Sequence, residues 1–226
     1  MNFIKENLNK IILGDSYELI KEIPDKSIDL IITDPPYGIR MDKGVNEGGG
    51  LTDRRRYKGN WDTETPPKWF FEEMKRVSKN MLIFGGNYFA DMLEKSNHWL
   101  VWDKVGNMDN GNFSDCELVY TNFKYNTVKK YYVLQKGFFN SGNDRIHPTQ
   151  KPEKLIRMLL KDYAQEGFLI ADFFSGSGTT AVVCKQEGFD FIAIEKDEEF
   201  YKKSVDRLNG IDSKGQISLF ADFAKI

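Results

Sequence analysis

Four consecutive residues, Asp34-Pro35-Pro36-Tyr37, combine a carboxylate, two rigid rings and an aromatic face in one short segment. They come directly after residues 28–33, an apolar run that predicts a buried strand. Because proline fixes the backbone torsion φ, the peptide carbonyls of this segment have a defined direction. The segment predicts a rigid, partly dry notch at a strand end, which suits a flat heterocycle with an exocyclic amino group.

A second candidate site is the glycine loop at residues 172–180, Asp-Phe-Phe-Ser-Gly-Ser-Gly-Thr-Thr, which also follows an apolar run. Gly176 and Gly178 allow tight turns and close approach of a ligand, and Thr179 opens a helical pattern whose amides point at the loop. The loop lacks the lysine of a Walker A motif and the third glycine of the dinucleotide fingerprint. The next strand pattern ends about twenty residues on at Glu195, where an acid can bind a ribose diol. Loop and acid favour a nucleoside cofactor; an ordinary strand–turn–helix connection is the alternative.

Seven apolar runs of strand length alternate with helical patterns, which predicts an α/β fold with a doubly wound, mostly parallel, seven-stranded sheet. The predicted strands are residues 10–15, 28–33, 80–85, 98–102, 117–121, 169–174 and 191–195. The predicted helices are residues 17–23, 67–77, 152–164, 179–187 and 198–208. Residues 116–134 are rich in aromatic and β-branched side chains without an intervening helix, so we expect an antiparallel hairpin there at the sheet edge.

Composition narrows the class of protein. The chain has 226 residues, of which 40% are hydrophobic, enough for one full α/β domain with a sizeable core. The net charge of −2 argues against a uniformly basic surface, although a local basic face stays open. Cys116 and Cys184 have no redox or metal spacing, and His98 and His147 have no acidic or cysteine cluster beside them, so no metal site is expected. Without a signal segment or a long apolar run, we expect a cytoplasmic protein that does not bind membranes.

With both segments considered, the chain resembles the β class of S-adenosylmethionine-dependent DNA amino-methyltransferases, the family of N6-adenine and N4-cytosine enzymes. In this permuted class the Asp-Pro-Pro-Tyr motif precedes the Phe-x-Gly-x-Gly motif, here Phe174-Ser175-Gly176-Ser177-Gly178. Two further segments match, Leu13-Gly14-Asp15 and His147-Pro148-Thr149-Gln150-Lys151-Pro152. The resemblance extends from about residue 10 to residue 208, and the joint occurrence of these motifs in this order is highly specific. It implies a Rossmann-like methyltransferase fold with a small target-recognition insert.

The resemblance also implies a pocket for S-adenosyl-L-methionine. Glu195 would bind the ribose of this cofactor, and Asp15 would lie near its adenine ring. Lys151 and Thr149 would meet its methionine carboxylate. The residues that would shape the rest of the cofactor pocket are Asp172, Phe174, Gly176, Gly178 and Thr179.

The Asp-Pro-Pro-Tyr residues would then be catalytic. An exocyclic amine on a nucleobase is a poor nucleophile, because its lone pair is delocalised into the ring. Asp34 and the Pro35 carbonyl can accept hydrogen bonds from the amine, which turns the lone pair toward the methyl group and offsets charge that develops on nitrogen. Pro35 and Pro36 fix the backbone, and Tyr37 offers a face for stacking. No cysteine nucleophile follows a proline, which disfavours methylation of a ring carbon.

A base within a duplex must be flipped out to reach such a notch, at a cost of about a few kcal/mol. Phosphate and base contacts would compensate for this cost. The candidate DNA-binding residues are Arg54, Arg55, Arg56 and Lys58 in one long loop, and Lys129, Lys130 and Arg145 near the predicted hairpin. The alternative for each of them is an ordinary solvated charge.

The leading hypothesis is site-specific methylation of adenine N6 in double-stranded DNA. Asp34 stands at the first motif position, where the family's cytosine-N4 enzymes more often carry serine. The alternatives are an N4-cytosine DNA methyltransferase, an RNA methyltransferase, and an inactive DNA-binding subunit.

We expect one catalytic domain over residues 1–208, with a mobile loop at residues 40–66 and a target-recognition region at about residues 106–145. A C-terminal tail follows at residues 209–226. In it, Gln216-Ile217-Ser218-Leu219-Phe220 resembles the pentapeptide by which bacterial DNA enzymes bind the sliding clamp; the alternative is a tail that covers the domain. From the resemblance we also name a second copy of the chain, in a homodimer, and a cognate restriction endonuclease as candidate partners.

Overall fold

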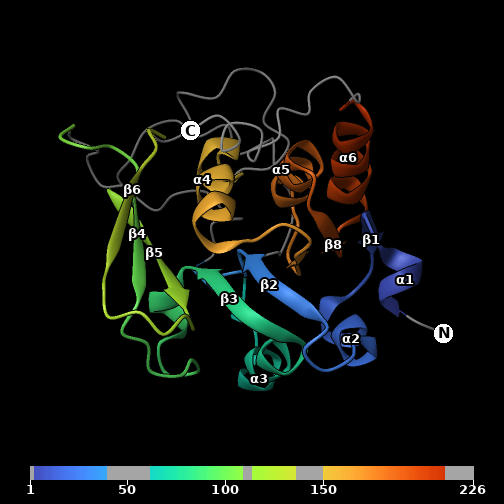
Figure 1. Cartoon of the computed structure of the whole chain (residues 1–226), viewed down its shortest axis with the longest axis horizontal. Helices are drawn as coiled ribbons and strands as arrows, with labels where there is room; N and C mark the ends of the chain where they lie inside the picture. The colour runs from blue at the N-terminus through green and yellow to red at the C-terminus, as the bar shows by residue number, and fades with distance from the viewer. Residues whose placement is uncertain (1–2, 40–61, 109–113, 136–149, 212–226) are drawn as a thin grey trace.

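The computed structural model describes residues 3–39, 62–108, 114–135 and 150–211. In this part of the chain the strands form one sheet with the order β1-β8-β7-β2-β3-β5-β4-β6 (Figure 1). The strands are β1 (Lys10–Leu13), β2 (Ile28–Thr33), β3 (Ser78–Phe84), β4 (Trp99–Asp103), β5 (Cys116–Thr121), β6 (Lys129–Tyr132), β7 (Leu169–Asp172) and β8 (Asp190–Glu195). The α-helices are α1 (Phe3–Asn7), α2 (Ser16–Leu19), α3 (Lys68–Val77), α4 (Glu153–Tyr163), α5 (Thr179–Glu187) and α6 (Glu198–Asn209). Two short 3-10 helices are also present in the described residues, η1 (Ile20–Glu22) and η3 (Gly86–Phe89).

The sheet is mostly parallel, as the alternating pattern predicted. Parallel pairing runs through β1, β8, β7, β2 and β3. Strand β5 pairs antiparallel with both β3 and β4, and β6 pairs parallel with β4. The doubly wound α/β class is therefore confirmed.

Two details of the predicted sheet were wrong. The described residues form eight strands rather than seven, because residues 116–134 contribute two separate strands. These two strands do not form a hairpin with each other, since β4 lies between them: Val101 pairs with Leu118 on one side and with Lys130 on the other. The antiparallel partner of β5 at this end of the sheet is β4, which precedes it in the chain. The edge position thus belongs to β6 alone.

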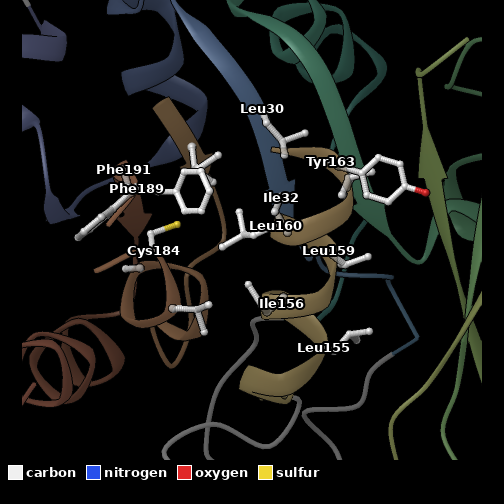
Figure 2. Packing of buried hydrophobic residues seen from close by; sticks show 14 of the residues in the cluster. Leu30, Ile32, Leu155, Ile156, Leu159, Leu160, Tyr163, Cys184, Phe189 and Phe191 are labelled. Atoms are coloured by element: carbon white, nitrogen blue, oxygen red, sulfur yellow. The ribbon is translucent and has the colours of Figure 1, made fainter. Parts of the chain in front are cut away.

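Helices cover both faces of the sheet. Helices α4, α5 and α6 lie on one face, and α3 lies with α2 on the other (Figure 1). On the first face, Leu155, Ile156 and Leu159 of α4 pack with Leu30 and Ile32 of β2, as Figure 2 shows. The next residue of β2, Ile31, belongs to the core on the opposite face, because side chains alternate along a strand. Burial of each such side chain stabilises the fold by about 1.5–3 kcal/mol.

Local signals explain where the helices begin. Asp197 caps α6, since its carboxylate accepts hydrogen bonds from the backbone N–H groups of Glu199 and Phe200 at 2.8 and 3.0 Å. Prolines precede α3 and α4, where the missing N–H group costs nothing. The long predicted helices match these elements to within two residues at each end, whereas the predicted helix at residues 17–23 is divided into α2 and η1.

None of the helices in the described ranges has the length and apolar character that a membrane span requires.

Candidate active site at the carboxyl ends of strands β2 and β7

The two candidate segments lie side by side, because β2 and β7 are parallel neighbours. Leu30 and Ile31 of β2 pair with Ile170 and Ala171 of β7, so both strands end at the same edge of the sheet. From β2 the chain continues to β3 on one side, and from β7 to β8 on the other. Such a reversal of strand order leaves a crevice at the carboxyl ends of the strands, where ligands of doubly wound proteins bind.

A hydrogen-bonded bridge joins the two segments within this edge. Thr33 Oγ1 donates to Asp172 Oδ1 at 2.8 Å and accepts from the backbone N–H of Phe173 at 3.2 Å. Thr33 is 1% exposed, so water does not compete for these bonds. The bridge fixes the residue that precedes Asp34 to the residue that opens the glycine loop.

The carboxylate of Asp34 is held by two groups. Its Oδ1 accepts a hydrogen bond of 2.5 Å from the Tyr37 hydroxyl, and its Oδ2 accepts one from the Lys151 ammonium. The Asp34 side chain is 20% exposed, and that of Lys151 is 9% exposed. Burial raises the pKa of Asp34, and the charge of Lys151 opposes this effect. Each oxygen of a carboxylate has a second lone pair, so Asp34 can still accept a bond from an incoming amine.

The ring of Tyr37 is fixed by its surroundings. It stacks on Tyr88 with ring centroids 4.6 Å apart and planes inclined by 14°. Its backbone N–H and that of Gly38 both donate to Asp62 Oδ1, at 2.7 and 2.9 Å. Gly85 approaches the ring so closely that a Cβ at this position would stand 2.5 Å from Tyr37 Cζ. One ring face of Tyr37 is therefore already covered by Tyr88.

A buried carboxylate that the sequence analysis missed lies beside Lys151. Glu117 Oε2 is 3.4 Å from Lys151 Nζ, and Glu117 Oε1 is 2.6 Å from Lys104 Nζ. Glu117 is on β5, Lys104 directly follows β4 and Lys151 precedes α4, so three separate elements bring these charges together. The Lys151 ammonium also lies 5.0 Å from the centre of the Phe84 ring. A charged residue within the otherwise apolar run of β5 was the available signal in the sequence.

The glycine loop is joined to Glu195 at the end of β8. Glu195 Oε2 accepts a hydrogen bond of 2.6 Å from the Gly176 amide, and its Oε1 accepts one of 2.8 Å from the Asp197 amide. Burial raises the pKa of Glu195, and these two amide bonds oppose the rise. The hydroxyl of Ser175 is buried and, within the part of the chain that the structure describes, has no hydrogen-bond partner. A buried loop with an unsatisfied hydroxyl and a nearby carboxylate is suited to a polar ligand.

Asp172 is buried at the start of the loop, and burial raises its pKa to about 6. Hydrogen bonds from Thr33 and Thr180 and from the Phe174 amide oppose this rise, and the charge of Asp34 adds to it. The Phe174 ring packs edge-on against Tyr17 and Phe70, with centroids 6.3 and 5.6 Å apart. Asp172 and Phe174 thus lie in the first part of the loop, directly at the end of β7.

Helix α5 begins at the glycine loop, as predicted. Gly178 adopts a φ of 73°, and a Cβ there would stand 3.0 Å from Ser204 Cβ, so glycine is needed for this approach to α6. The Thr179 hydroxyl accepts a hydrogen bond of 3.1 Å from Arg207, which also donates to the Ser177 carbonyl at 3.0 Å. Arg207, a residue that the sequence analysis missed, pairs in turn with Glu153 of α4 at 2.7 Å. Thr179 therefore fixes the loop to α6.

Asp15 lies at the end of β1, next to the end of β8, since Gly14 donates its amide to the Glu195 carbonyl at 2.9 Å. Its carboxylate caps α2 through the Tyr17 amide at 3.0 Å and pairs with Lys196 at 2.7 Å. The pKa of Asp15 is lowered: burial alone would raise it, but the bonds from Lys196 and Tyr17 outweigh burial. Asp15, Glu195, the glycine loop and Asp34 thus share one edge of the sheet.

The candidate DNA-binding residues fall into two groups. Lys129 and Lys130 lie on the edge strand β6, with β4, β5 and β3 between them and β2. Their ammonium groups are exposed and pair with Asp162 and Asp103 at 3.6 and 3.2 Å, and such exposed pairs are weak. The other predicted site residues, Arg54, Arg55, Arg56, Lys58, Arg145 and Thr149, lie outside the described residues, as do residues 216–220.

Comparisons with known proteins agree with this arrangement. A family model described as DNA methylase, of the N6/N4 type, matches residues 96–206. The type II methyltransferase M.HpaI of Haemophilus parainfluenzae is 29% identical over 248 residues, which cover 90% of this chain and 76% of that protein.

Solved structures show the same fold. The structure of M1.HpyAVI in complex with SAM has a TM-score of 0.61 and 24% identity, and the match covers 88% of this chain and 98% of that one. The cytosine-N4-specific PvuII DNA methyltransferase has a TM-score of 0.60 and 16% identity, with 90% and 86% of the two chains covered. The motif order, the shared sheet edge and these similarities agree: the chain is similar to the DNA methylases of the N6/N4 type, and residues 96–206 match their family model.

Proposed function

We propose that this protein transfers a methyl group from S-adenosyl-L-methionine to the N6 amino group of an adenine that is flipped out of double-stranded DNA. The observation that carries the proposal is the bridge from Thr33 to Asp172, which holds the Asp34 notch beside the glycine loop. Methyl transfer between two molecules needs both to be held in contact, and adjacent strand ends provide this.

The residues of the β1, β7 and β8 ends fit such a cofactor. When bound, S-adenosylmethionine supplies an electrophilic methyl group on a sulfonium centre. Glu195 retains free lone pairs for a ribose diol, and the unsatisfied Ser175 hydroxyl is a further group that a polar ligand can engage. The other residues that would hold it are Asp15, Thr149, Lys151, Asp172, Phe174, Gly176, Gly178 and Thr179.

Asp34 acts on the target amine. A hydrogen bond from the amine to the Asp34 carboxylate turns the nitrogen lone pair out of conjugation with the ring, and the negative charge stabilises the cationic nitrogen of the transition state. The Pro35 carbonyl accepts the second amine hydrogen. The bond from Tyr37 keeps the carboxylate in one orientation. The target base stacks on the Tyr37 ring, which requires Tyr88 to move or the base to use the other face.

Adenine is proposed as the target because Asp34 occupies the first motif position. The N4-cytosine reaction is the second candidate, and the similarity to the fold of the cytosine-N4-specific PvuII enzyme favours it as the alternative. Both reactions use an exocyclic amine on a flipped base, so the same residues would serve either one. The remaining candidates are methylation of RNA and DNA binding without catalysis. An experiment must distinguish these from the two DNA methylation reactions.

We propose that basic residues of the predicted loop at residues 40–66 and of the region at residues 106–145 contact the DNA backbone. These are Arg54, Arg55, Arg56, Lys58, Lys129, Lys130 and Arg145. A target-recognition region at about residues 106–145, a homodimer, a sliding-clamp contact through residues 216–220 and a cognate endonuclease stay predictions.

The direct test uses methyl-labelled S-adenosylmethionine and unmethylated bacterial DNA, with the wild-type protein and Asp34→Ala side by side. The DNA is then digested to nucleosides, and the labelled product is identified. Label in N6-methyladenine that the variant loses supports the proposal. Label in N4-methylcytosine keeps the mechanism and changes the base. If DNA receives no label while the protein binds the cofactor, structured RNA is tried next, and the binding-only role remains.

A further inference from the structure

Glu117 offers a second carboxylate to the ammonium that neutralises Asp34. Lys151 Nζ donates to Asp34 Oδ2 and lies 3.4 Å from Glu117 Oε2. Glu117 Oε2 is buried and, within the described ranges, has no hydrogen bond of good geometry, so its contact with Lys151 is an ion pair without directed bonding. One ammonium is thus shared between two carboxylates that lie on different strands.

This sharing bears on catalysis, because Asp34 can promote methyl transfer only while its negative charge faces the amine. An ammonium bound to Oδ2 weakens that charge. Lys151 can leave Asp34 at small cost only if another anion receives it, since an unpaired buried charge is costly. Glu117 is such an anion within the protein itself, besides the cofactor carboxylate proposed above for Lys151. The charges of Lys151 and of Lys104, 2.6 Å from Glu117 Oε1, lower the pKa of Glu117 against the effect of burial.

We propose that Glu117 is a positioning residue that receives the Lys151 ammonium and so frees Asp34 for the target amine. This inference rests on the proposed methyl-transfer function and assigns to that site a residue that does not touch the substrate. In the ligand-free protein Lys151 contacts both carboxylates, and entry of the amine moves it toward Glu117.

The charged groups around this centre give opposite expectations for two variants. Lys151 faces Asp34 and Glu117, and both carboxylates raise its pKa, while burial lowers it. Glu117→Gln removes one anion, so the pKa of Lys151 should fall. Lys104→Met removes a cation on the far side of Glu117, so the pKa of Lys151 should rise. A side chain with only a packing role would not produce opposite changes.

A pH profile gives a second independent readout. Asp34 faces Lys151, Tyr37 and Glu117, and its charge also reaches Asp172. The negative charge of Glu117 raises the pKa of Asp34, so the acidic limb of kcat should move to lower pH in Glu117→Gln.

The experiment compares the wild-type protein with Glu117→Gln, Lys104→Met and a matched control, Glu187→Gln. Glu187 is also a buried glutamate with one unsatisfied oxygen, but it lies on α5 and its partner is Arg157, at 2.5 Å, instead of the two lysines that Glu117 contacts. The Lys151 titration is followed by NMR of labelled lysine in the ligand-free proteins. Methyl transfer to DNA is measured in parallel as kcat and KM against pH.

We expect kcat to fall on the order of tenfold in Glu117→Gln, with the KM for DNA little changed, since residues in contact couple in this range. An unchanged Lys151 midpoint in both site variants, or a kcat equal to that of Glu187→Gln, overturns the inference. If the wild-type protein methylates nothing, the proposed function fails, and with it the positioning role of Glu117 in methyl transfer. The NMR series then still decides whether Glu117 controls the Lys151 charge.

Discussion

Thr33 Oγ1 and Asp172 Oδ1 are joined by a hydrogen bond of 2.8 Å between residues 139 positions apart in the chain. The bond links the end of β2 to the end of β7, and both partners are buried. It also acts on charge, because the Thr33 hydroxyl stabilises the ionised form of Asp172 against the effect of burial. The geometry of the site and the protonation of Asp172 are therefore coupled.

Asp172→Asn should change how stability depends on pH. The pKa of Asp172 is about 6 in the folded protein against an ordinary value of 3.8, so the folded state binds the proton more tightly than the unfolded state. The wild-type protein loses stability from this group as pH rises between these values. A difference of this size in pKa corresponds to about 3 kcal/mol of unfolding free energy.

The variant lacks this penalty, so its stability relative to the wild type should rise between pH 4 and 6, whatever constant offset the amide introduces. Urea unfolding of both proteins at several pH values measures the difference. A difference that stays constant across this range would contradict the shifted pKa of Asp172.

Gly85→Ala should disturb Tyr37. Gly85 has a φ of 69°, and its new Cβ would overlap the Tyr37 ring. The ring must move, which breaks its bond to Asp34. Gly167→Ala is the control, because Gly167 has a φ of 81° but nothing within 4 Å of the added atom. Both variants should lose about 1–2 kcal/mol of stability from backbone strain, but only Gly85→Ala should also lose methyl transfer. Equal activity in the two variants would argue against a fixed role of the Tyr37 ring.

Tyr37→Phe should move the acidic limb of kcat to higher pH. The Tyr37 hydroxyl donates to Asp34 and stabilises its ionised form, so its removal raises the pKa of Asp34 further. The direction is opposite to that expected for Glu117→Gln. Tyr88→Phe is the control, because it keeps the stacked ring and leaves Asp34 untouched. A limb that does not move in Tyr37→Phe would mean that Asp34 does not control the acidic side of the profile.

Arg207→Met should weaken cofactor binding and the fold together. Arg207 bonds to the Ser177 carbonyl and the Thr179 hydroxyl and pairs with Glu153, so its loss frees the glycine loop. Loss of hydrogen bonds to a charged group costs roughly 1.5–3 kcal/mol each. Calorimetric titration with S-adenosylmethionine and urea unfolding measure the two effects.

The control for this change is Lys203→Met on the same helix. Its pair with Glu199 at 2.5 Å is exposed, and such pairs contribute at most about 1 kcal/mol. If the two variants bound the cofactor equally well, Arg207 would have no part in shaping the loop.

The sequence predicted the parallel half of the fold well, because each strand there is a continuous apolar run followed by a helix. It failed for residues 116–134, where two strands are separated by a partner that comes earlier in the chain. Nothing local in the sequence distinguishes a hairpin from this arrangement, since Cys116–Thr121 and Lys129–Tyr132 have suitable composition for either. Which strands pair when they are not consecutive in the chain depends on the whole folded sheet, so local sequence patterns do not predict it.

The motifs predicted that Asp34 and the glycine loop follow neighbouring strand ends, but they did not reveal the side chains that meet this edge from distant parts of the chain. Asp34 and the glycine loop each directly follow a strand. Because these two strands, β2 and β7, are parallel neighbours, the two motifs lie close together in space although they are far apart in the sequence. Glu117 and Arg207 act through partners about thirty residues or more away, Lys151 at 34 positions and Ser177 at 30. The contact of Lys151 with Asp34 likewise spans 117 positions.

The pairing of β1 with β8 has a consequence for the order in which the protein folds. Leu13 pairs with Glu195, so one of the first strands to be made must wait for one of the last. Strands β2 and β3 can pair much earlier, and contacts between distant parts of a chain form slowly. During synthesis from the N-terminus, the strand that leads into Asp34 and its neighbour β3 are therefore available to pair well before Asp15 can lie beside Glu195. The nascent chain carries β1 without its final neighbour for most of that time.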